Sequence, residues 1–206
     1  MGVTYMRDKI DVYLSKIPPS TNYLSLYPKS RNDEIFGVNN QKVKSQKYWV
    51  WKLLEHALKS SLGINIEDVE FFKTKSGKWL CDKCYFSLSH SENIVAVAIY
   101  NQKVGVDIEL IREIDQDAVI KRLTESEKEQ LSNLSPDVRQ RFLIEKWSQK
   151  ESIFKSSDNE IFLPSKIDTT KKRVLSKFVV IDKKEYVLSI ASENIYDIDL
   201  KETDEI

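Results

Sequence analysis

The sequence has few cysteines and histidines, no excess of charge and no long apolar run. It contains two cysteines, two histidines and 32 acidic against 32 basic residues, so its formal net charge is zero. Because a nucleic-acid-binding protein usually presents a net basic surface, the balance argues against that class, although it does not exclude a local basic patch. No apolar run reaches the ~18 residues that suggest a membrane-spanning helix. We therefore expect neither nucleic acid nor membrane as a partner.

The N-terminus also lacks the usual targeting signals. Residues 1–16 have no basic start followed by an apolar stretch, as a secretory signal would. Position 6 is methionine, where a myristoylation signal has serine or threonine. With 206 residues, of which 41% are hydrophobic and 31% charged, the chain can form one large or two small domains with an ordinary core. We expect a cytoplasmic protein.

The two cysteines, Cys81 and Cys84, are spaced C-x-x-C. This spacing supplies half of a structural zinc site, which His56 and His90 could complete only if the fold brought them near. A redox C-x-x-C pair usually opens a helix, whereas this pair lies between a Gly-Lys turn and an expected strand. We interpret it as two reduced loop thiols in a reducing compartment.

Hydrophobic periodicity and turn residues predict an α+β chain without a low-complexity linker. We expect strands at residues 9–15, 22–27, 93–101 and 103–110, a strand pair within 69–80 around a Ser76–Gly77 turn, a hairpin over 177–192, and helices at 39–61, 117–122, 124–134 and 137–156. Gly63 should end the first long helix, and Thr124 with Glu127 forms a capping-box pattern. Each half carries a long aromatic-bearing helix and a later apolar strand, an internal echo that two similar α+β halves would explain.

The stretch "VGVDIEL" (residues 104–110) places two carboxylates on one side of a strand. Since side chains alternate along a strand, Asp107 and Glu109 share a face with Gly105, while the valines and Ile108 face the other way. Two like charges this close repel each other unless a cation lies between them or water screens them. The face is therefore either a half-exposed polar surface or half of a cation site.

The stretch "WSQKESIFK" (residues 147–155) places Glu151 and Lys155 one helical turn apart, with Trp147 a turn earlier. An ordinary surface ion pair, stabilising the helix by about 0.2–0.5 kcal/mol, is the plainer interpretation. The alternative is that the helix presents both charges to a ligand and that Trp147 anchors it.

In "SLSHS" (residues 87–91), His90 stands among hydroxyl groups just before a buried strand. It is either a satisfied structural histidine or, with Ser89, a donor to a phosphate. Combined with the carboxylates of Asp107, Glu109 and Glu151, and with the lysine one turn beyond the last of them, it suggests an octahedral Mg²⁺ site surrounded by phosphate-binding groups. Mn²⁺ also suits oxygen ligands.

These stretches have the order and spacing of a known family. "FSLSHS" (86–91), "GVDIE" (105–109) and "WSQKESIFK" (147–155) resemble the three signature motifs of the 4′-phosphopantetheinyl transferases of the surfactin-synthetase-activating type. "KSGKW" (75–79) resembles the "GKP" turn of that family, and "SRNDEI" (30–35) is similar to its N-terminal basic and acidic segment.

The resemblance implies a monomeric, pseudo-twofold fold of two similar α+β halves, here residues 1–102 and 103–206, with the active site in the cleft between them. It implies transfer of the 4′-phosphopantetheine arm of coenzyme A to a serine of an apo acyl or peptidyl carrier protein. The products would be the holo carrier and adenosine 3′,5′-bisphosphate, in a Mg²⁺-dependent reaction. Length and layout favour carriers of secondary metabolism, such as nonribosomal-peptide or polyketide synthesis.

Residue by residue, the resemblance implies that Asp107, Glu109 and Glu151 hold Mg²⁺ on the pyrophosphate. Lys155 and His90 would contact the phosphates, and the lysine would balance charge on the leaving group. Glu151 or Glu109, directly or through a metal-bound water, would deprotonate the carrier serine; the residues do not decide between them.

The nucleotide end would meet a second set of residues. Lys75 and Ser89 are expected at the nucleotide itself, and Arg31, Lys44 and Lys47 are the candidates for the 3′-phosphate.

Three departures from the family pattern stand out. Trp79 replaces the usual proline, Asn93 stands near a common glycine, and "SSDNEIFLP" (156–164) has no glycine after the lysine of the third motif. The last departure bears on partner choice rather than on activity.

Two other functions use the same residues. A different Mg²⁺-dependent phosphoester enzyme, such as a nucleotide hydrolase, would turn over nucleotide without any carrier protein. A non-catalytic module that binds a carrier protein or a nucleotide would keep its function after Asp107→Ala.

Overall fold

The structure is a computed structural model in which residues 9–19, 22–75, 77–194 and 197–203 are described. The chain divides into two compact units, residues 1–101 with 196–206 and residues 102–195. Residues 1–8, on which the N-terminal signal expectations mainly rest, and Ser76 of the expected turn lie outside the described residues. No helix in the part of the chain described is both long and apolar enough to cross a membrane.

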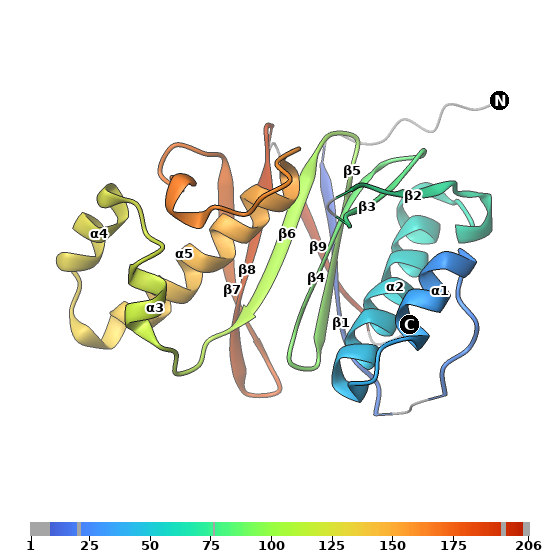
Figure 1. Cartoon of the computed structure of the whole chain (residues 1–206), viewed down its shortest axis with the longest axis horizontal. Helices are drawn as coiled ribbons and strands as arrows, with labels where there is room; N and C mark the ends of the chain where they lie inside the picture. The colour runs from blue at the N-terminus through green and yellow to red at the C-terminus, as the bar shows by residue number, and fades with distance from the viewer. Residues whose placement is uncertain (1–8, 20–21, 76, 195–196, 204–206) are drawn as a thin grey trace. The chain divides into compact units, whose positions relative to one another are not determined.

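The first unit combines a four-stranded sheet, a two-stranded hairpin and two helices (Figure 1). Its elements are β1 (Ile10–Lys16), α1 (Lys29–Phe36), α2 (Gln41–Leu62), a one-turn helix (Ile66–Asp68), β2 (Phe71–Lys73), β3 (Trp79–Cys81), β4 (Tyr85–Ser91), β5 (Ile94–Tyr100) and β9 (Ile198–Thr203). The sheet order is β4-β5-β1-β9, and β2 pairs with β3. Strand β1 is antiparallel to β5 and parallel to β9.

Helix α2 supplies most of the core of this unit and follows the prediction closely. The Asn40 side chain caps its start by accepting a hydrogen bond from the Val43 backbone N–H at 3.1 Å. Gly63 ends it in the left-handed conformation at φ 69°, which glycine adopts without strain. Its apolar face, including the fully buried Trp51, packs against the sheet, mainly on β5, all of whose residues are buried.

The second unit packs one long helix on a three-stranded antiparallel sheet (Figure 1). Its elements are β6 (Val104–Leu110), α3 (Gln116–Ile120), α4 (Glu125–Ser132), α5 (Pro136–Ser156), a one-turn helix (Pro164–Lys166), β7 (Val174–Ile181) and β8 (Lys184–Ser192). The sheet order is β6-β8-β7. The expected capping box is present at the start of α4, with both the Thr124 and the Glu127 side chains engaged.

Residues 22–27 do not form the expected strand. The Leu24 backbone N–H donates to the Tyr48 hydroxyl at 3.0 Å, and the Leu26 N–H donates to the Asn32 side-chain oxygen at 3.0 Å. Side chains from α2 and α1 thus satisfy backbone groups that a neighbouring strand would otherwise pair. Of the apolar residues that suggested a strand, Leu26 is buried in the core with α2 and Tyr23 packs against it, whereas Leu24 is exposed.

The C-terminal strand also differs from expectation. The sequence suggested that residues 103–206 form one half, but β9 runs beside β1 in the first unit, pairing Ile10 with Ile198 and Ser15 with Thr203. The Lys201 ammonium donates to Asp11 Oδ1 at 2.9 Å and fixes the pairing. The mixed α+β class is confirmed; the pseudo-twofold relation of two halves remains a prediction.

Candidate active site

Strand β6 lies directly against helix α5. A Cβ atom at Gly105 would stand 1.8 Å from the Ser152 carbonyl oxygen and 2.7 Å from the Ser156 backbone nitrogen, so a larger residue does not fit. Asp107, two residues further on the same face, is 2% exposed. The interpretation of this face as a half-exposed polar surface is therefore wrong at Asp107, whose carboxylate faces the helix.

Lys155 links the strand to the helix. Its ammonium donates to Asp107 Oδ1 at 2.7 Å and to the Val106 carbonyl oxygen at 3.2 Å, and it lies 3.7 Å from Glu151 Oε2. The Glu151–Lys155 pair expected from the helical spacing is present, but the shorter contact of the lysine is to Asp107. The surface-pair interpretation is therefore incomplete, because three charges from two elements meet here.

The pKa values in this cluster report an excess of negative charge. Burial, and then the Asp107 carboxylate, raise the pKa of Glu151 above its ordinary value. Burial alone would lower the pKa of Lys155, but the carboxylates of Asp107, Glu151 and Glu109 raise it above its ordinary value. Asp107, Glu151 and Lys155, which lie together, carry a formal charge of −1 when all are ionised. Such a cluster is stabilised by protonation or by a bound cation.

The carboxylate oxygens of Asp107, Glu109 and Glu151 are of the type that divalent cations bind, but they do not form a complete coordination shell. In the described ranges, no three His, Cys, Asp or Glu side chains stand close enough to hold a metal ion unaided. Mg²⁺ commonly takes one or two protein carboxylates and fills its other positions with water and substrate phosphates. Asp107 and Glu151, which already lie together, match that requirement if a substrate supplies further oxygens.

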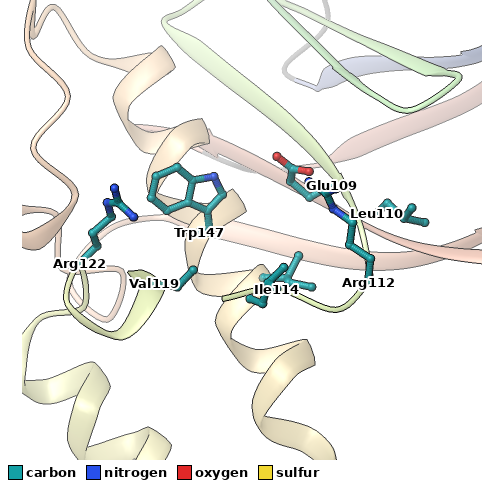
Figure 2. A pocket seen from close by; sticks show the side chains of 8 residues that line it. Glu109, Leu110, Arg112, Ile114, Val119, Arg122 and Trp147 are labelled. Atoms are coloured by element: carbon teal, nitrogen blue, oxygen red, sulfur yellow. The ribbon is translucent and has the colours of Figure 1, made fainter. Parts of the chain in front are cut away.

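A pocket of about 160 Å³ opens beside Glu109. In Figure 2 the Trp147 ring lies between the side chains of Arg122 and Glu109, and Arg112 stands beside Glu109. The Arg122 guanidinium is 5.6 Å from the centroid of the Trp147 ring. Trp147 therefore lines a pocket, beyond its expected role as a packing anchor. Neither arginine was predicted from the sequence, although Arg112 lies two residues beyond the end of the strand that carries Glu109.

The size of this pocket limits what it can hold. Sites for drug-sized ligands enclose about 300–1,000 Å³, so this one accommodates only a small group or one arm of a larger molecule. Its walls combine aliphatic side chains with two cations and one carboxylate; the lining residues are Glu109, Leu110, Arg112, Ile114, Val119, Arg122, Ile144 and Trp147.

The residues expected to meet the nucleotide and its phosphates, apart from Lys155, belong to the first unit. On β4, Ser89 is 6% exposed whereas His90 is exposed, and their neighbouring side chains point to opposite faces of the sheet. Lys75 is exposed in the connection between β2 and β3. Of the expected pair on β4, His90 is thus the residue with the accessible side chain.

Glu34 on α1 gathers a basic cluster in the same unit. Its carboxylate lies 3.1 Å from Arg31, 3.2 Å from Lys47 and 2.9 Å from Lys73, and the Trp79 ring N–H donates to it at 3.1 Å. Burial would raise the pKa of Glu34, but these donors hold it at about 2. Three cations around one carboxylate leave a charge of +2, which suits an anion.

The three candidates for the 3′-phosphate play different parts in this structure. Arg31 is 5% exposed, stacks 4.7 Å from the Trp51 ring centroid and donates to the Lys47 carbonyl oxygen, so it is mainly a framework residue. The Lys47 side chain is 32% exposed within the cluster. Lys44 lies apart, 5.9 Å from the centroid of Phe36.

Sequence reasoning missed Glu34 and Lys73, which complete the basic cluster. The i,i+3 spacing of Arg31 and Glu34 was a usable local signal. No local signal indicates Lys73, because its contact with Glu34 joins residues far apart in the sequence.

Comparison with known proteins gives two matches. Residues 103–196 match a family model described as the 4′-phosphopantetheinyl transferase superfamily. The chain is also similar to the 4′-phosphopantetheinyl transferase gsp of Aneurinibacillus migulanus, with 33% identity over 113 residues, which covers 54% of this chain and 48% of that protein. The chain thus aligns with about half the length of this curated relative.

Proposed function

We propose that this chain is a 4′-phosphopantetheinyl transferase, because residues 103–196 match the model of that superfamily and the chain is similar to a curated transferase. It transfers the phosphopantetheine arm of coenzyme A to a serine of an apo carrier protein. The products are the holo carrier and adenosine 3′,5′-bisphosphate. The observation that carries the proposal is the contact between Lys155 on α5 and Asp107 on β6, with Glu151 beside it, because it joins two of the three sequence motifs in one charged cluster.

The bond changes define what these groups must do. The serine hydroxyl oxygen attacks the β-phosphorus of coenzyme A, and the bond from that phosphorus to the bridging oxygen of the α-phosphate breaks. Negative charge therefore grows on the departing nucleotide, and the serine loses a proton. Lys155, held by Asp107, places a fixed positive charge that stabilises the negative charge on the departing nucleotide. Glu151 or Glu109 accepts the proton, directly or through water.

Mg²⁺, or Mn²⁺ in its place, is the proposed cofactor. Asp107, Glu109 and Glu151 are its proposed protein ligands, and a cation is supported by the burial and the Asp107 carboxylate that raise the pKa of Glu151. When bound, the ion would polarise the phosphoryl oxygens and neutralise charge on the leaving group.

Residues of the first unit are the proposed contacts to the rest of coenzyme A. We assign His90 to a phosphate, Lys75 and Ser89 to the nucleotide, and Lys47 with Lys44 to the 3′-phosphate. In this assignment Arg31 acts by holding Glu34 and the Lys47 backbone rather than by reaching solvent. We also propose that the enzyme acts as a monomer.

Intact-mass spectrometry of an apo carrier protein tests the proposal. Incubated with this protein, coenzyme A and Mg²⁺, an acyl or peptidyl carrier should gain one phosphopantetheine. Asp107→Ala, Lys155→Met and addition of EDTA should each abolish the gain or slow it at least a hundredfold, as loss of one transition-state charge contact does. Glu113→Ala, an exposed acidic residue after β6, is the matched control and should stay active.

The same assay separates the other functions. Nucleotide release without a carrier protein would point to a hydrolase. Full activity of Asp107→Ala would refute the assigned site. Peptidyl, polyketide and fatty-acid carriers should be compared, because we expect the carriers of nonribosomal-peptide and polyketide synthesis to be the better substrates.

A further inference from the structure

The proposed transfer leaves the Cys81–Cys84 pair unused. Cys81 is the last residue of β3 and Cys84 directly precedes β4. Their sulfur atoms lie 3.7 Å apart, and both are half-buried free thiols. The sequence suggested two reduced loop thiols, and the structure brings them into contact across a two-residue turn.

Small reagents can reach both thiols. A surface pocket of about 510 Å³ in the first unit is lined by the two cysteines and by Phe72, Leu80, Asp82, Lys83, Tyr85 and Asn101. Its two charged groups, Asp82 and Lys83, pair with each other at 2.7 Å and leave no large net charge at the sulfur atoms. With this volume, the pocket can accommodate a small disulfide of peptide size.

The two sulfurs differ in character. The hydrogen bond with the Cys84 thiol lowers the pKa of Cys81 to about 7, and the backbone N–H groups of Lys83 and Cys84 reinforce this against burial and the Asp82 carboxylate. The same contact, together with burial, raises the pKa of Cys84. Since the thiolate is the reactive form, Cys81 is suited to attack and Cys84 to follow.

We propose that Cys81 and Cys84 form a thiol–disulfide exchange site for low-molecular-weight disulfides. The Cys81 thiolate attacks one sulfur of the small disulfide, whose S–S bond breaks, and one small thiolate leaves. Cys84 then loses its proton and attacks the Cys81 sulfur, so that the mixed S–S bond breaks and the second small thiolate leaves. Two protein thiols are oxidised to one disulfide and one small disulfide is reduced to two thiols, which take up the two protons.

The local geometry allows the product. A disulfide bond is about 2.05 Å long, so sulfurs already in contact at 3.7 Å reach it by side-chain rotation and a small adjustment of the turn. The bond would join the end of β3 to the start of β4. The site involves none of the carboxylates assigned to the transfer reaction, so either proposal can fail without the other.

Intact-mass spectrometry of the full chain with glutathione disulfide at neutral pH, without metal or oxygen, tests the proposal. The wild-type chain should lose the mass of two hydrogens, and dithiothreitol should restore it. Cys84→Ser should stop at the first step and carry one glutathione on Cys81, located by peptide mapping. Cys81→Ser should form a glutathione adduct at least about tenfold more slowly, because burial still raises the pKa of the remaining Cys84 thiol.

A second readout needs no variant. Peptide-resolved alkylation of the native wild-type chain should follow a pH profile centred near 7 for Cys81, below the ordinary value of about 8.5 seen after denaturation. Equal alkylation of both cysteines with the ordinary pKa would overturn the proposal. So would an unchanged mass with glutathione disulfide, or disulfides formed only between two chains.

Discussion

Among single residues, Glu34 organises much of the charge around it in the first unit. Its carboxylate contacts three cations and the Trp79 ring N–H, and it turns separate lysines into one cluster. The contacts join α1, α2, β2 and β3. A residue with this role stabilises the fold and also sets the positions of Lys47 and Lys73, whose side chains are 32% and 41% exposed.

Glu34→Gln should change how stability depends on pH. Because the folded-state pKa of Glu34 is about 2, below its ordinary 4.5, its contribution is complete above the ordinary value and is lost as pH falls toward 2. We expect the variant to lose on the order of 2 kcal/mol of unfolding free energy at neutral pH, after allowance for solvent screening, and to show a shallower decline on acidification.

Urea unfolding at stepped pH values measures this effect. Glu55→Gln is the control, because Glu55 pairs with Lys52 three residues earlier on the same helix and its side chain is 38% exposed. If Glu34→Gln and wild type declined in parallel below pH ~5, the role assigned to Glu34 would be wrong.

Gly105 sets the spacing between β6 and α5, and Gly105→Ala should therefore be costly. The added carbon meets backbone atoms, which cannot rotate away, so the helix must move. We expect a loss of about 2 kcal/mol or more in unfolding free energy, and a lower turnover because Asp107 and Lys155 separate. Gly37→Ala is the control: its φ is −72°, its closest contact is 3.2 Å, and it should lose less than about 1 kcal/mol. Equal losses would contradict the argument.

At the scale of elements, Lys150 explains how α5 is fixed to its surroundings. Its side chain and that of Glu127 on α4 are 1% and 0% exposed and lie 2.6 Å apart. Lys150 also donates to the carbonyl oxygens of Pro164 and Ile167, and Glu127 accepts from Thr169. The lysine next to Glu151 in the third motif is thus a buried anchor rather than a ligand contact.

Lys150→Met should destabilise the second unit strongly. Removing one partner leaves a buried carboxylate unpaired, which typically costs about 3–5 kcal/mol. Lys128→Met removes an exposed pair with Glu125, whose side chain is 90% exposed, and should cost about 0.5 kcal/mol or less. Thermal unfolding of both variants by circular dichroism tests the difference; similar midpoints would rule out a buried structural role for Lys150.

The elements that could be predicted are those specified by their own residues. Asn40 and Gly63 bound α2, Thr124 and Glu127 open α4, and alternation identifies β6. Residues 22–27 were wrongly predicted as a strand, because their backbone N–H groups bond to side chains of two helices instead of to a neighbouring strand. Strand β9 escaped notice because its alternation of apolar and polar residues is short, from Ile198 to Lys201, and its pairing partner β1 lies at the other end of the sequence.

At the scale of the whole molecule, the motifs indicated a resemblance to a family but not how the charges combine. Asp107, Glu151 and Lys155 could be grouped from strand and helix periodicity. Their contacts could not, because these depend on the approach of α5 that Gly105 permits. The Glu34 cluster needed the fold, since it assembles side chains from four elements.

The division of the assigned groups between two units leads to a last prediction, which rests on the proposed function. If Lys47 contacts the 3′-phosphate of coenzyme A and Lys155 the pyrophosphate, the two lysines should respond differently to 3′-dephospho-coenzyme A in calorimetry. Wild type should bind the dephospho form about tenfold more weakly, the effect of one charge-assisted contact. Lys47→Ala should bind both forms with that weaker affinity, so that removing the phosphate has no further effect.

Lys155→Met should bind both ligands more weakly and still keep the tenfold preference for the 3′-phosphate, because the group it loses lies at the other end of the nucleotide. Glu34→Gln, which keeps Lys47 but frees it from its carboxylate, should preserve a preference of the same sign. If Lys47→Ala retained the full preference for the 3′-phosphate, Lys47 would not be part of the 3′-phosphate site. Lys44 would then be the alternative, and Lys44→Ala would test it by the same comparison of the two ligands.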